Sequence, residues 1–137
     1  MSIRGFASDN YAGIHPDVLE AIAEANHGHQ TAYGDDEVTA EFQKLVKKLF
    51  GNNAVGFPVF NGTGANVVAL QAAIPRWGAV IAAATSHLNL DEGGAPEKMG
   101  GIKLWNVEIP KGDGKLTTEL IEPELIDFGF VHRSQQA

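Results

Sequence analysis

The chain has 137 residues, a formal net charge of −7 and a hydrophobic content of 44%. This size and composition are typical of one globular domain with a hydrophobic core, and they exclude a disordered segment. Basic residues gather only at Lys44, Lys47 and Lys48, so the acidic balance argues against nucleic-acid or anionic-membrane partners.

The chain contains no cysteine. Disulfides, thiolate metal sites and cysteine nucleophiles are therefore excluded. The first ten residues have no apolar core of signal-peptide length, and no apolar run approaches the roughly 20 residues of a membrane span. We expect a soluble, cytoplasmic protein.

Two amphipathic helices are predicted in the first third of the chain. Residues 16–26 begin with proline, which suits the first helical position, and Gly28 follows as a stop. Residues 37–50 carry an apolar stripe at helical spacing, Asp35 or Asp36 can cap their start, and Gly51 ends them.

Residues 54–60 read as an apolar strand that leads through Asn61-Gly62-Thr63-Gly64 into a helix over 64–74. Glycines let such a turn approach a ligand closely, and the first helical turn presents unpaired N–H groups, so the pattern favours an anion site with Thr63 as an extra donor. It is neither a P-loop nor a dinucleotide fingerprint, because no Gly-Lys-Ser/Thr follows and Val67 replaces the third glycine. A bare tight turn is the alternative.

Further strands are predicted at 79–84 and 102–109, and a last helix begins near Thr117. Alternating strands and helices predict parallel βαβ units in an α/β fold, with ligands at the carboxyl ends of the strands. We therefore expect an N-terminal segment with two helices over 1–53 and a βαβ core over 54–137. A sheet with three strands leaves faces uncovered, so either the chain is a fragment or a partner completes the sheet.

The histidines offer one weak and one stronger candidate site. His27 and His29 lie near Asp35 and Asp36 in sequence, but this spacing is not typical of a metal site and we expect no metal. His87 follows a predicted strand, in a loop with carboxylates and Gly93-Gly94. In isolation, a histidine in this setting is more often a hydrogen-bonded structural residue than a catalytic one; together with a phosphate turn one strand away, it favours a cofactor site.

Several motifs occur along the chain in a familiar order. They are Ser8-Asp9-Asn10, Tyr33-Gly34-Asp35-Asp36, Asn61-Gly62-Thr63-Gly64-Ala65-Asn66, His87 with Asp91-Glu92-Gly93-Gly94-Ala95-Pro96-Glu97, and Asp113-Gly114-Lys115-Leu116-Thr117. This order resembles the low-specificity L-threonine aldolases. That group belongs to the aromatic amino acid β-eliminating lyase/threonine aldolase family of fold-type I pyridoxal phosphate (PLP) enzymes.

The resemblance implies a fold and a set of site residues. The fold would be the N-terminal part of the large PLP-binding domain of an aspartate aminotransferase-like enzyme, with a mostly parallel sheet flanked by helices. The implied roles are phosphate binding by Gly62, Thr63 and Gly64, ring stacking and proton transfer by His87, carboxylate binding by Ser8, pocket lining by Tyr33 and Glu92, and approach to the substrate hydroxyl by His132.

The implied reaction is retro-aldol cleavage of threonine or allo-threonine to glycine and acetaldehyde. PLP withdraws electrons from the substrate Cα, and a base near the hydroxyl is needed, for which His87 and His132 are the candidates. The family also implies a homo-oligomer, either a tetramer or a dimer.

The lysines depart from the family pattern. None of the seven matches the Schiff-base lysine motif, which in the family lies beyond the point where this chain ends. We expect this chain to be the N-terminal part of such an enzyme and to be inactive alone. The alternatives are a non-catalytic α/β phospholigand-binding module, a degenerate subunit, or a PLP β-eliminating lyase on the same scaffold.

Overall fold

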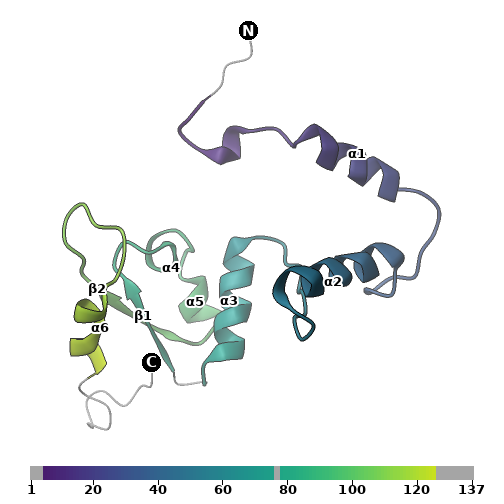
Figure 1. Cartoon of the computed structure of the whole chain (residues 1–137). Coiled ribbons are helices and arrows are strands. Elements are labelled where there is room, and N and C mark those ends of the chain that lie inside the picture. The colour runs from purple at the N-terminus through teal and green to yellow at the C-terminus, as the bar shows by residue number, and fades with distance from the viewer. Residues whose placement is uncertain (1–4, 76–77, 126–137) are drawn as a thin grey trace. The chain divides into compact units, whose positions relative to one another are not determined.

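The computed structural model describes residues 5–75 and 78–125 of the chain. It falls into two compact units, Met1–Phe57 and Pro58–Ala137 (Figure 1). The positions of the parts relative to one another are not determined, so each unit is described by itself. The expected division into 1–53 and 54–137 stays a prediction.

The first unit contains a 3₁₀ helix, Asp9–Tyr11, and two α-helices, α1 (Pro16–Ala25) and α2 (Glu37–Phe50). Both predicted helices are confirmed. Pro16 opens α1, and Asp36, not Asp35, caps α2: its Oδ1 accepts from the Thr39 main-chain N–H at 2.8 Å. Gly51 ends α2 with a φ of 100°, a conformation that suits glycine.

The predicted strand at 54–60 is wrong, because the described residues offer this segment no neighbouring strand. Part of its backbone pairs with a side chain instead. Gln43 of α2 donates from Nε2 to the Gly56 carbonyl at 2.7 Å and accepts from the Gly56 N–H at 3.0 Å. One amide side chain therefore satisfies both backbone groups that a neighbouring strand would have paired.

The second unit is a βαβ arrangement preceded by a helix. The order is α3 (Gly62–Ala73), β1 (Ala79–Ala83), α4 (His87–Leu90), α5 (Ala95–Lys98), β2 (Lys103–Val107) and α6 (Thr118–Leu125). The two strands pair in parallel, with Ala79 opposite Lys103 and Ala83 opposite Val107. The parallel α/β class is therefore confirmed. The short helices α4 and α5 were not predicted, and α3 begins two residues earlier than expected.

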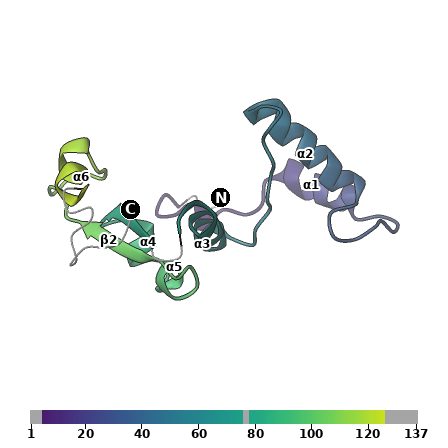
Figure 2. The same cartoon turned by 90° about the horizontal axis from the view of Figure 1, so that it is seen from below.

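A small core holds the second unit together. Ala79 and Ala82 of β1 and Val107 of β2 are buried, as are Ile102 and Pro96. Helix α3 packs against α5, and α5 against β2 (Figure 2). In Figure 1 the N-terminal end of α3 and helix α4 lie at the same, upper end of this unit. Among the described residues, no helix has the length and apolar character to cross a membrane.

Candidate active site

The N-terminus of α3 presents free backbone donors. Asn61 caps the helix: its Oδ1 accepts from the Gly64 N–H at 2.8 Å, and its carbonyl accepts from the Ala65 N–H at 3.0 Å. The N–H groups of Gly62 and Thr63 have no acceptor within the described part of the chain. They lie at the positive end of the helix dipole, so the geometry suits an anion.

Two details of the predicted turn need correction. Neither Gly62 nor Gly64 has a positive φ, so the turn does not depend on glycine for its backbone angles. The Gly64 N–H is also committed to Asn61, so it is not a free donor. At Gly62 the space that a Cβ would fill is empty to 4 Å. The absent side chain therefore leaves room beside the two free donors.

His87 lies at the first position of α4, four residues after Ala83, the last residue of β1. Its side chain is 65% exposed. Asn89 anchors the short helix, because its Nδ2 donates to the Ala84 carbonyl and its Oδ1 accepts from Asn106 Nδ2, both at 2.8 Å. The imidazole is thus accessible, on a helix that is tied to the ends of both strands.

Glu92 contacts this imidazole through the ring nitrogen Nδ1. Its side chain is fully buried, and its Oε1 lies 2.9 Å from His87 Nδ1, within hydrogen-bond distance, and accepts from Asn66 Nδ2 of α3 at 2.5 Å. Its Oε2 is buried and has no hydrogen-bond partner among the described residues. Gly93 and Gly94 follow with φ of 60° and 75°, so the chain turns immediately after the carboxylate. The structure therefore joins α3, Glu92 and His87 in one hydrogen-bonded chain.

Asn66 is the site residue that sequence reasoning missed. It belongs to the Asn61–Asn66 motif, but no local sequence pattern predicts its hydrogen-bond partner, Glu92, because that residue is 26 positions away. A polar amide among the apolar residues of a helix is the only signal that marks it, because such a group needs a buried partner.

The other predicted site residues lie elsewhere. Ser8 and Tyr33 belong to the first unit, so their approach to His87 stays a prediction. The Ser8 Oγ accepts from the Asn10 N–H at 3.2 Å. Tyr33 is fully exposed with a φ of 65°, and such a conformation in a bulky residue marks a strained position of the kind that occurs at ligand sites. His132 lies outside the described residues.

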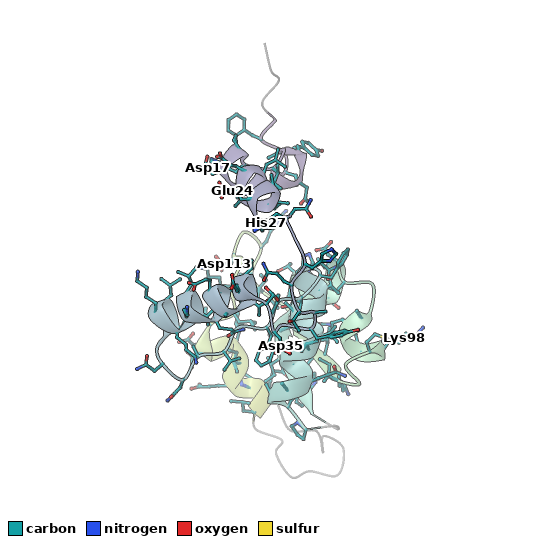
Figure 3. The ribbon with its side chains drawn as sticks, turned by 90° about the vertical axis from the view of Figure 1, so that its right-hand side faces the viewer. Asp17, Glu24, His27, Asp35, Lys98 and Asp113 are labelled. Carbon is teal, nitrogen blue, oxygen red and sulfur yellow. The ribbon has the colours of Figure 1, made fainter. Side chains whose placement is uncertain are left out.

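The weaker candidate site, around His27 and His29, lies in the first unit. Figure 3 shows His27 at the end of α1 and Asp35 ahead of α2, on different segments of the chain. A cavity of about 420 Å³ is lined by His29, Asp35, Asp36 and Glu37 among others, and its carboxylates would repel an anion. Within residues 5–75 and 78–125, no group of three or more metal-ligating side chains comes together.

Comparison of the sequence with known proteins assigns the chain to a family. The sequence profile of the beta-eliminating lyases matches residues 5–137. The chain belongs to the beta-eliminating lyase family. Two relatives are low specificity L-threonine aldolases. The one from Pseudomonas sp. (strain NCIMB 10558) is 48% identical over 93% of this chain. The one from Pseudomonas aeruginosa is 49% identical over 82% of this chain.

A solved structure agrees with this family membership. The threonine aldolase of Leishmania major superposes on 91% of this chain with a TM-score of 0.79 and 31% sequence identity. The expected fold class, that of the large domain of these enzymes, is therefore confirmed. The chain spans about a third of the relatives' length: 36% and 32% of the Pseudomonas enzymes and 36% of the Leishmania chain.

Proposed function

We propose that this chain supplies part of the active site of a PLP-dependent aldolase, a carbon–carbon lyase that cleaves threonine or allo-threonine to glycine and acetaldehyde. The observation that carries the proposal is the hydrogen-bonded chain from α3 through Glu92 to His87. It places an accessible imidazole in the same unit as the free N–H groups of Gly62 and Thr63. The family and the threonine aldolases among its relatives support the substrate class.

The residues present fit the cofactor. Two free N–H groups and the Thr63 hydroxyl are donors of the kind that a phosphate accepts from, at the positive end of a 12-residue helix. Gly62 and Thr63 would hold the phosphate, and Gly64 would contribute through Asn61, which shapes the turn. When bound, PLP supplies the electron sink for cleavage next to the amino group.

The protein's own residues would bind the substrate and move its protons. His87 would stack on the cofactor ring and act near the substrate hydroxyl, where a neutral imidazole nitrogen can accept a proton. His132 would share that role, Ser8 would bind the carboxylate, and Tyr33 and Glu92 would line the pocket.

We also propose that the protein is a homo-oligomer, either a dimer or a tetramer. The apolar stripe of α1 supports this, because Val18, Leu19 and Ile22 are about half exposed and the described residues of α1 and α2 include no buried side chain. Apolar helix faces of this kind normally bury against another surface. Light scattering of the active protein measures the assembly.

A chimera tests the activity. The segment of the Pseudomonas sp. aldolase that aligns with this chain is replaced by this chain, and glycine and acetaldehyde are measured with threonine and PLP. We expect turnover, and we expect His87→Asn to lower kcat by about 100-fold or more, the contribution of a positioned acid or base. His27→Asn is the control and leaves kcat unchanged, because His27 is exposed and its one hydrogen bond among the described residues is with the Glu24 carbonyl of α1.

Other outcomes identify the alternatives. Release of pyruvate and ammonia together with phenol from tyrosine or indole from tryptophan, with no cleavage of threonine, would assign β-elimination. PLP or phosphate binding without either reaction would support the non-catalytic phospholigand module or a degenerate subunit. Equal activity of the His87→Asn chimera would remove His87 from the mechanism.

A further inference from the structure

We propose that Asn66 is a positioning residue that, through Glu92, fixes His87 in the tautomer with a proton on Nδ1 and a free lone pair on Nε2. The inference rests on the proposed function only where kinetics are used as a readout. Its structural basis is the shared acceptor, Glu92 Oε1, which receives both Asn66 Nδ2 and His87 Nδ1.

The direction of the hydrogen bonds follows from the carboxylate. An amide Nδ2 can only donate, so Glu92 Oε1 accepts from Asn66. A carboxylate has no proton to give, so the Glu92 carboxylate oxygen that lies 2.9 Å from His87 Nδ1 requires Nδ1 to carry the proton. In a neutral imidazole the other nitrogen then has the free lone pair. Nδ1 is the nitrogen engaged by Glu92, so Nε2 on the other side of the ring is the one left for a ligand.

Asn66 also keeps the carboxylate in place. The Glu92 side chain is fully buried, and its Oε2 has no partner among the described residues. Its held oxygen therefore has two donors, one from His87 and one from Asn66. Asn66 comes from α3, the helix whose N-terminus carries the free donors of Gly62 and Thr63. One rigid element thus sets both the anion donors and the orientation of the imidazole.

The chemistry explains why the tautomer matters. A group that orients an imidazole through one ring nitrogen decides whether the other nitrogen can accept a proton, and the wrong tautomer lowers catalysis without moving the ring. His87 Nε2 in the proposed tautomer can accept a proton from a bound hydroxyl or from a water. In the opposite tautomer it would be a donor and could not act as a base.

The first test reads the tautomer directly. In the chimera labelled with ¹⁵N-histidine, the two ring nitrogens of His87 are followed by NMR at a pH where the imidazole is neutral, and the His87→Asn chimera identifies their signals. We expect one tautomer with the proton on Nδ1. Asn66→Leu removes the donor that keeps the Glu92 carboxylate against Nδ1, and Asn66→Asp replaces it with a second acceptor of the same shape, which repels the carboxylate. Both changes release the Glu92 oxygen from Nδ1, so both should shift His87 towards Nε2–H or a mixture.

The second test reads the kinetics of the same variants. Asn66→Leu and Asn66→Asp should lower kcat by about 10- to 100-fold, the size typical when a group that orients a ligand or base is lost, with KM changed less than kcat because substrate contacts remain. The matched control is Gln71→Leu. Gln71 is an amide on the same helix, donates from Nε2 to the Met99 carbonyl at 2.8 Å, and is exposed, so its loss should change neither tautomer nor kcat.

The outcomes separate this inference from the proposed function. An unchanged Nδ1–H tautomer in folded Asn66→Leu and Asn66→Asp chimeras overturns the positioning role, whatever the activity. A tautomer shift in chimeras that never cleave threonine upholds the positioning role and rejects the aldolase. If Asn66→Leu fails to fold by circular dichroism, the isosteric Asn66→Asp variant decides.

Discussion

At the start of α3, glycine matters for the space it leaves free. Gly62 has an ordinary helical backbone, and the place of its missing Cβ is open to 4 Å. At Gly64 a Cβ would approach the capping Asn61 Oδ1 at 3.3 Å. One glycine therefore keeps the site accessible, while the other keeps the cap intact.

Gly62→Ala should separate cofactor affinity from stability. Alanine is a better helix former than glycine and meets no neighbour here, so the free energy of unfolding should stay level or rise by up to about 1 kcal/mol. The methyl group would occupy the space of the phosphate, so PLP affinity of the chimera should fall by about 10-fold or more, roughly 1.4 kcal/mol. Absorbance titration with PLP and urea denaturation measure the two quantities.

Gly114→Ala is the control for this prediction. Gly114 also has open space and no positive φ, and it lies in the loop before α6. Neither PLP affinity nor stability should change much there. Unaltered PLP affinity in Gly62→Ala would contradict the placement of a phosphate against Gly62.

At the residue scale, the sequence predicted which residues belong to the site better than it predicted the hydrogen bonds between them. His87 and Glu92 are five residues apart, and both were predicted to belong to the site. Their link to Asn66 spans 26 residues and depends on how α3 packs beside α5, which no local pattern contains. Gly64 was predicted to bind the phosphate, but its N–H donates to the Asn61 side chain, as commonly occurs at the N-cap of a helix.

At the scale of elements, capping decides where the helices begin. Asp36 shows this at α2. Hydrogen bonds from the Thr39 main-chain N–H, and then from its hydroxyl, hold the pKa of the Asp36 carboxyl below its usual value of 3.8. The ionised carboxylate also lies at the positive end of the helix dipole, where negative charge is favourable.

The Asp36 cap predicts an acid-sensitive helix. A carboxyl whose pKa is lower in the folded chain stabilises it above the unfolded value of about 3.8, and that stabilisation is lost as the pH falls through the still lower folded value. Asp36→Asn keeps a capping oxygen that does not titrate. The stability advantage of the original chain over Asp36→Asn, measured in the chimera by urea denaturation, should therefore shrink between pH 5 and about pH 3. A constant difference across that range would contradict this role.

The elements were predictable where the pattern is local and regular. The stripes of α1 and α2, the proline at the start of α1 and the glycine after α2 are such signals, and these helices are where they were expected. Residues 54–60 have the composition of a strand, but strand formation needs a partner, and Gln43 meets the Gly56 backbone instead. The four-residue helices α4 and α5 are too short to show a periodicity.

At the scale of the whole molecule, this chain carries one part of a site that the proposed function requires to be larger. The second unit contains the anion donors, His87 and Glu92, whereas Ser8 and Tyr33 belong to the first. The resemblance places the Schiff-base lysine in sequence outside this chain, and the relatives are about three times as long.

The 137-residue chain by itself should therefore not cleave threonine. With PLP added, we expect no glycine or acetaldehyde above background, whereas the chimera, which adds the remaining two thirds of the Pseudomonas enzyme, should turn over. Both are measured in the same assay at equal protein concentration. Robust turnover by the chain alone would show that its own residues complete the site.

The buried carboxylate of Glu92 also limits how stable the second unit can become. Folding transfers this group out of water, and one of its oxygens finds no partner among the described residues, an arrangement that costs about 1–3 kcal/mol. An apolar residue of similar size would fold more readily there but could not orient an imidazole. The second unit is thus less stable than it could be at a position that orients His87, a trade-off between stability and activity.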